Sequence, residues 1–173
     1  MSKELTILEK LELLIPGFKG YKQRELIRED DALVRRKVAS ILDDARLRVE
    51  RLISSVKRRD ITLALRLDDL RLELMKVAQM IRHATYGYAG LFDRVHIDEP
   101  ELMRLLEMDY RLITQASAIL EKVYEMNPTM EPQEFREKLE ETFTLLNRLE
   151  DNIRLRERMF KTEEVSEGWK SYQ

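Results

Sequence analysis

Apolar residues recur at alternating steps of three and four along most of this chain, and few glycines or prolines interrupt them. This spacing is typical of amphipathic helices, because 3.6 residues complete one turn. The chain has 173 residues, with only 5 glycines and 4 prolines. No stretch alternates with period two for long enough to form a strand. The sequence therefore predicts an all-α protein.

Breakers and capping residues divide the chain into one short and four long predicted helices. We expect them at residues 3–14, 22–59, 60–85, 98–127 and 131–161. Short connections make neighbouring long helices antiparallel. We therefore expect an antiparallel four-helix bundle of long helices, with the additional short N-terminal helix packed on one end. This makes a single domain over residues 1–161, followed by a flexible tail over residues 162–173.

The stripes also predict which side chains are buried. The third predicted helix begins at Asp60, an expected N-cap, and carries a heptad of Leu63, Leu67, Leu70, Leu74, Val77 and Ile81. A second apolar edge of Leu65, Leu72 and Met75 widens that stripe, so we expect this helix to be the most buried. The stripe expected on the fourth helix is Leu102, Leu106, Tyr110, Ile113, Ser117, Leu120 and Tyr124. The acidic pairs Asp30-Asp31, Asp43-Asp44 and Asp68-Asp69, and the Asp31–Arg35 pair, are expected on the solvated surface.

Two loops of unusual composition are expected at the same end of the bundle. Residues 15–21 and 85–97 share that pole if the long helices alternate in direction. Each loop has two glycines three positions apart with aromatic neighbours, whereas the loops at the other pole have no aromatic residue. The candidate partner-binding residues at this pole are Phe18, Lys19, Tyr21, Tyr86, Tyr88 and Phe92.

Two interpretations of this pole stay open. In one, the aromatic side chains form a contact surface, because aromatic residues dominate binding hot spots and loops on a rigid scaffold often carry function. In the other, they only close the open end of the bundle around the short first helix, and Gly87 ends a helix as its C′ residue.

The sequence carries no catalytic or metal-binding signature. It has no cysteine. The Glu-x-x-His pairs of di-iron bundles are missing, since Met80 and Asp93 stand three positions before His83 and His96. Phosphate-loop, nucleophile-elbow and zinc-protease motifs are also absent. We therefore expect no enzymatic activity, no metal site and no cofactor.

Basic residues suggest a different function. Two runs associated with the second predicted helix offer possible contacts to phosphate: Arg35, Arg36, Lys57, Arg58 and Arg59. Acidic residues interleave with both runs and the formal net charge is -2, so nucleic-acid binding is disfavoured. A nucleic-acid- or ribosome-associated helical factor is one alternative. A membrane-remodelling protein that acts through its first helix is another.

Two blocks of residues at the aromatic pole resemble a known group. The first is Ile15-Pro16-Gly17-Phe18-Lys19-Gly20-Tyr21-Lys22, continued by Arg24-Glu25, Arg28-Glu29, Asp31 and Leu33-Val34-Arg35; the second is Tyr86-Gly87-Tyr88 with Gly90, Phe92 and Asp93. These blocks resemble a group of uncharacterised prokaryotic all-helical proteins associated with SPFH/band-7 membrane scaffold proteins. Asp30 stands where that group is expected to have a small residue. The resemblance implies no activity, but it does imply a protein partner beside such a scaffold.

The sequence favours a non-enzymatic adaptor or scaffold that binds a protein partner through the aromatic pole. No apolar run approaches the roughly 20 residues that span a bilayer, and the first residues do not resemble a signal peptide. We therefore expect a cytoplasmic protein, which the resemblance would place at the periphery of a membrane. The sequence does not set the oligomeric state and leaves a homo-oligomer open.

Overall fold

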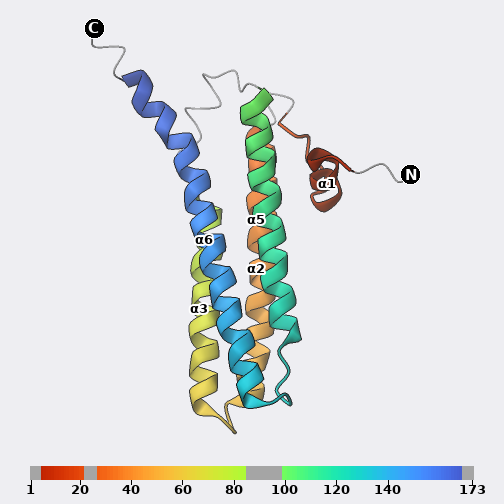
Figure 1. Cartoon of the computed structure of the whole chain (residues 1–173), viewed down its shortest axis with the longest axis vertical. Coiled ribbons are helices and arrows are strands. Elements are labelled where there is room, and N and C mark those ends of the chain that lie inside the picture. Colours follow the sequence, from red (N-terminus) through yellow and green to blue (C-terminus); the bar gives the residue numbers. More distant parts are fainter. Residues whose placement is uncertain (1–4, 22–26, 85–98, 169–173) are drawn as a thin grey trace.

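The computed structural model describes residues 5–21, 27–84 and 99–168. Helices in these ranges are α1 (Ile7–Leu14), α2 (Ile27–Val56), α3 (Ile61–His83), α5 (Glu99–Glu125) and α6 (Pro132–Gly168). The long helices α2, α3, α5 and α6 lie side by side, and the short α1 sits beside one end of α5 (Figure 1). The described ranges contain no strand. The prediction of an all-α protein is confirmed, and its helices pack as a bundle.

The contacts between helices define how the bundle is built. Helix α2 packs against α3 and α5, and α6 packs against α5 and α3. The core lies between them, because each helix turns its apolar stripe inward. The buried residues of α2 include Val34, Val38, Ile41, Ala45, Val49, Leu52 and Val56. They are the stripe that the sequence predicted for this helix.

The burial of apolar residues on helix α3 agrees only in part with the prediction. Five of the six heptad residues are buried, and Leu63 is partly buried against the core. The second apolar edge, Leu65, Leu72 and Met75, is exposed instead. The prediction that both edges are buried was wrong. Among the described helices, α3 packs chiefly against α2 and α6, and the side that carries Leu65, Leu72 and Met75 stays exposed.

The buried face of α5 coincides only in part with the predicted stripe. Its centre is formed by Leu112, Ala116, Ile119 and Val123, which are fully buried. Tyr124, predicted to be in the core, is exposed and lies under the guanidinium of Arg48. Leu106 and Ile113 of the predicted stripe are buried as well. Contact with both α2 and α6 therefore buries parts of two adjacent apolar stripes.

The helix ends follow local chemistry. Asp60 caps α3 as predicted, since its carboxylate accepts a hydrogen bond of 2.9 Å from the backbone N–H of Leu63. Helix α1 begins later than expected, at Ile7, where Thr6 and Glu9 form a capping box. Helix α6 continues to Gly168, seven residues beyond the expected end near Lys161. Its last turns lean away from α5 (Figure 1).

Helix α1 is fixed to the bundle by its apolar face. Leu11 and the C-cap residue Ile15 are buried, and the ammonium of Lys10 lies 5.7 Å from the ring centroid of Tyr110 on α5. Among the described helices, none is long and apolar enough to cross a lipid bilayer.

Candidate functional site

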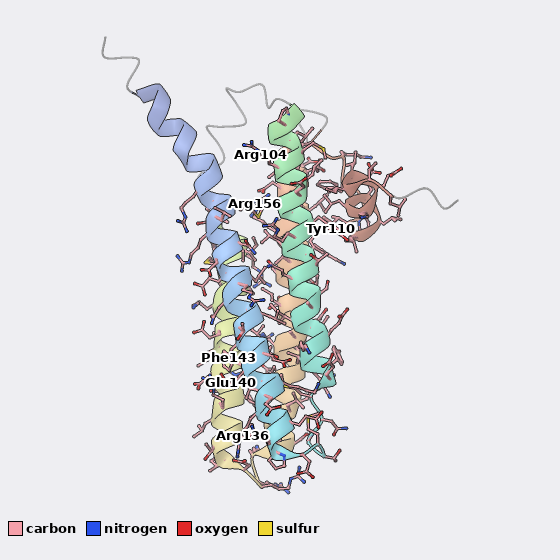
Figure 2. The ribbon with its side chains drawn as sticks, in the orientation of Figure 1. Arg104, Tyr110, Arg136, Glu140, Phe143 and Arg156 are labelled. Carbon is pink, nitrogen blue, oxygen red and sulfur yellow. The ribbon has the colours of Figure 1, made fainter. Side chains whose placement is uncertain are left out.

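A cluster of buried polar side chains lies where α2, α5 and α6 meet the loop after α1. Its members are Tyr21, Asp30, Asp31, Arg35, Asp109 and Arg156. Arg156 lies on α6 at the end of the bundle that also holds Tyr110 and α1 (Figure 2). Burying charged groups is costly unless they are paired and hydrogen-bonded. The pairing within the cluster therefore decides whether this end of the bundle is stable.

Arg156 is the centre of the cluster. Its Nε donates to Oδ1 of Asp109 on α5 at 2.8 Å, and its Nη2 donates to Oδ1 of Asp31 on α2 at 2.9 Å. Only 1% of Arg156 is exposed. The planar guanidinium can hold two carboxylates in fixed directions. One side chain thus joins three helices.

The second arginine extends the cluster to α3. Arg35 Nε donates to Oδ2 of Asp31 at 2.8 Å, and Arg35 Nη1 donates to the carbonyl of Arg82, in the last turn of α3, at 3.0 Å. Asp31 therefore accepts from one arginine on each of its oxygens. The helix macrodipole also favours a cation near the C-terminal carbonyls of α3. The expectation that Asp31 and Arg35 form a solvated surface pair was wrong, because both are buried.

Tyr21 connects the loop after α1 to α5. Its hydroxyl donates to Oδ2 of Asp109, the carboxylate that also binds Arg156. Burial raises the pKa of the Tyr21 phenol well above its ordinary value, and the neighbouring Asp109 carboxylate raises it further. Burial also raises the pKa of Asp109, against the opposing effects of the Arg156 charge and the Tyr21 hydroxyl.

Asp30 holds the loop itself. Its two carboxylate oxygens accept from the backbone N–H groups of Lys19 and Tyr21, at 2.9 and 2.8 Å. Tyr21 has a φ of 59°, which is uncommon for a residue with a side chain. Its left-handed backbone brings this N–H group to a carboxylate that is itself buried. The expectation that Asp30 faces solvent was therefore also wrong.

Among the described side chains that bind Arg156 and Arg35, the charges balance. Two arginines face the two carboxylates of Asp31 and Asp109, while the Asp30 carboxylate is satisfied by backbone donors. Enzymes use tyrosine, aspartate and arginine side chains for catalysis. Here each of the six residues of the cluster is at least 93% buried. The arrangement has the chemistry of an internal brace that fixes the loop and four helices to one another.

A sequence signal for this brace exists and was missed. Asp31 stands three positions before Val34, Asp109 three before Leu112, and Arg156 three after Ile153. Each charged residue therefore continues the buried apolar stripe of its own helix by one step. A charged residue in register with a core stripe predicts burial, and burial predicts an opposite charge from another helix.

The predicted aromatic pole is only partly described. Phe18 and Tyr21 are buried, with their rings edge to face at a centroid distance of 5.4 Å, and Lys19 is exposed. For Phe18 and Tyr21, this placement favours the interpretation that aromatic residues close the end of the bundle. Tyr86, Tyr88 and Phe92, and also Gly87, lie outside the described residues.

The predicted phosphate contacts do not form one surface. Arg35 is buried in the cluster, which contradicts its expected role as a surface cation. Arg36 is exposed near the start of α2, whereas Lys57, Arg58 and Arg59 are exposed just after its end, about 30 Å away at 1.5 Å per residue. Arg59 Nη2 also donates to the carbonyl of Pro128 at 2.6 Å.

The most distinctive described surface is an apolar stripe on α3. Its residues are Ile61, Leu65, Leu72 and Met75, which are 64%, 62%, 44% and 42% exposed. At 100° per residue they lie within about 80° of arc, and they extend for about 21 Å along the helix. The opposite face of α3 is buried against α2 and α6. We name these four residues the α3 stripe.

Polar contacts to α6 border the α3 stripe on one side. The guanidinium of Arg66 stacks on the ring of Phe143 at 4.0 Å from its centroid, and it donates twice to Glu140 at 3.0 Å. Phe143 and Glu140 both lie on α6 (Figure 2). Lys76 pairs with Glu150 of α6 at 3.1 Å. These contacts direct the flanking cations toward α6, which leaves the apolar side chains of the stripe uncovered.

Comparisons with protein-family models, with curated proteins and with solved structures found no match to this chain. Within residues 5–21, 27–84 and 99–168, no group of three or more His, Asp or Glu side chains is placed to hold a metal ion.

Proposed function

We propose that this chain is a non-enzymatic protein–protein interaction module that binds its partner through the α3 stripe. The observation that carries the proposal is the exposure of Ile61, Leu65, Leu72 and Met75 on a helix whose other face is in the core. Together they present an apolar area on the order of a few hundred Å², the size at which exposed patches on monomers often mark a binding site.

The rigidity of α3 supports this function. The helix is held by a capped N-terminus at Asp60, by the buried stripe on its inner face, and by the bond from Arg35 to its last turn. A surface that is already ordered loses little entropy when a partner binds. A partner that presents an apolar helix face would bury the stripe, at about 25 cal/mol for each Å² removed from water.

The same proposal extends to the architecture. We infer that the bundle is the antiparallel four-helix arrangement expected from the sequence. The bond between Arg35, near the start of α2, and Arg82, at the end of α3, supports opposite directions for these two helices. Short connections after α2 and α5 support it as well.

Photo-crosslinking tests the binding surface directly. A photoreactive amino acid is placed at Leu65 in one variant and at Leu155 in a matched control, and each is irradiated in cells of the source organism. Leu155 is an apolar α6 residue, 44% exposed. We expect a specific crosslinked protein with the Leu65 variant and none with the control. Equal crosslinking from both positions would contradict the proposal.

Fractionation of the same cells identifies the class of partner. The resemblance to helical proteins associated with SPFH/band-7 scaffolds makes a membrane scaffold protein the first candidate, so membrane and soluble fractions are analysed separately. Crosslinks to ribosomal or nucleic-acid-binding proteins that vanish after nuclease treatment would instead favour the function based on Arg36, Lys57, Arg58 and Arg59.

A further inference from the structure

The order of residues in the α3 stripe has a symmetry that bears on what covers it. Ile61 and Met75 each lie seven positions from Asp68, and Leu65 and Leu72 lie three and four positions from it. The stripe therefore reads nearly the same in both directions along the helix. Two copies of α3 that run antiparallel would place Ile61 opposite Met75 and Leu65 opposite Leu72, twice each. This is the residue pattern that a two-fold interface requires.

We propose that the α3 stripe pairs with the α3 stripe of a second copy of this chain, antiparallel, about a two-fold axis near Asp68. The proposal rests on the proposed function, because it names the partner of the same surface. In this pairing, each apolar residue of the stripe contacts an apolar residue of the other copy.

One charged pair lies at the middle of the stripe. Asp68 lies within the arc of the stripe and pairs with Arg71 at 2.6 Å, and Arg71 lies on the side nearer Glu50 of α2. In the two-fold pairing the two Asp68 carboxylates come together at the axis, and each brings its own Arg71 as counter-ion. The two arginines therefore offset the repulsion between the two aspartates.

The size of the surface sets how strong the pairing is. A stable interface buries about 800 Å² on each partner, and the four apolar side chains supply only a part of that area. The flanking side chains of α3 add to it. We therefore expect a dimer that dissociates on dilution through the micromolar range, as interfaces at the small end do.

Sedimentation equilibrium of the purified full chain measures the pairing. The monomer mass is 20.7 kDa, and we expect the weight-average mass to rise toward twice this value with concentration. Leu65→Glu with Leu72→Glu places four carboxylates in the interface and should keep the chain monomeric at every concentration. Leu155→Glu is the matched control, equal in chemistry and equal in exposure to Leu72, and should dimerise like the unchanged chain.

Cysteine crosslinking then tests the direction of the helices. The chain has no cysteine, so single introduced thiols report on one contact each. Under mild oxidation, Leu65→Cys mixed with Leu72→Cys should give a disulfide-linked dimer well above the amount from either variant alone. A parallel pairing would reverse this result, with each variant linking mainly to itself, and would overturn the antiparallel arrangement.

The outcomes separate this inference from the proposed function. A chain that remains monomeric at all concentrations overturns the pairing, and if photo-crosslinking from Leu65 still captures another protein, the proposed function stands. A monomeric chain with no crosslink from Leu65 overturns both. A dimer that persists in the Leu65→Glu, Leu72→Glu variant, with circular dichroism unchanged, also overturns the pairing, because it must use another surface.

Discussion

Replacing Arg156 with methionine tests whether the buried cluster holds this end of the bundle together. Methionine fills much of the same volume but removes both bonds to Asp31 and Asp109. The charge balance among the described side chains then fails, since Arg35 remains as the one described arginine of the cluster beside two buried carboxylates. One carboxylate must stay charged without a counter-ion or take up a proton, and either outcome destabilises the folded state.

The expected loss follows from the burial of the pairs. Removing one partner of a buried ion pair costs about 3–5 kcal/mol, because the other charge is left uncompensated. Exposed pairs contribute about 0.2–1 kcal/mol. Arg154 offers the matched control on the same helix, since it pairs with Glu150 at 2.7 Å while its side chain is 54% exposed. Arg154→Met should therefore cost several kcal/mol less than Arg156→Met.

Urea unfolding followed by circular dichroism at 222 nm measures both losses. For an m-value of about 2 kcal/mol/M, a loss of 3–5 kcal/mol lowers the midpoint by about 2 M. Arg156→Lys keeps the charge but loses the planar fork, so its midpoint should lie between those of the unchanged chain and Arg156→Met. The lysine variant keeps the experiment informative if the methionine variant does not fold.

A second substitution checks the charge argument itself. Asp109→Asn combined with Arg156→Met restores the balance, because Arg35 then faces Asp31 alone. The double variant should lose about 1–3 kcal/mol less than the sum of the two single losses. Strict additivity, or a cost of Arg156→Met no greater than that of Arg154→Met, would refute the reasoning that a balanced buried cluster braces the bundle.

Three further predictions concern the loop after α1. The pKa of Tyr21 is raised in the folded state, so the folded state keeps a proton that the unfolded state loses near pH 10, and the free energy of unfolding should fall as pH rises above about 10. The Tyr21→Phe variant should be less stable at neutral pH, but its stability should fall less on going to alkaline pH. Urea midpoints measured at several pH values check both expectations. Asp30→Asn replaces the carboxylate that accepts from the Tyr21 N–H group, and losing a hydrogen bond to a charged group costs about 1.5–3 kcal/mol. Amide hydrogen exchange at Tyr21 should therefore accelerate about 10-fold or more. Both Gly17 and Gly20 have positive φ, but only at Gly20 would an added Cβ collide with Leu8. Gly20→Ala should therefore lower the melting temperature more than Gly17→Ala does. Equal shifts in melting temperature would contradict this.

The buried cluster also explains why α1 can dock although it is short. A helix of eight residues is marginal by itself. Here the chain that follows it is fixed by the Asp30 carboxylate and by the bond from Tyr21 to Asp109. The apolar contacts of Leu11 and Ile15 then need to contribute only part of the docking energy.

The helices and most of their inward faces were predictable from the sequence. The step of three and four, the breakers Pro16 and Gly17, and the cap at Asp60 are local signals, since a helix forms and ends through contacts between residues close in the chain. The α2 stripe from Val34 to Val56 was predicted correctly for this reason.

Tertiary structure alone decided how the buried charges are paired and which apolar edges are covered. Arg156 and Asp31 are 125 positions apart, so no local pattern reveals that each supplies the counter-charge that lets the other be buried. Neighbouring helices likewise decided that the second edge of α3 is exposed and which residues of α5 are buried. A helix with more than one apolar edge is ambiguous until its neighbours are placed, because the same side chain is core where a helix covers it and exposed surface where none does.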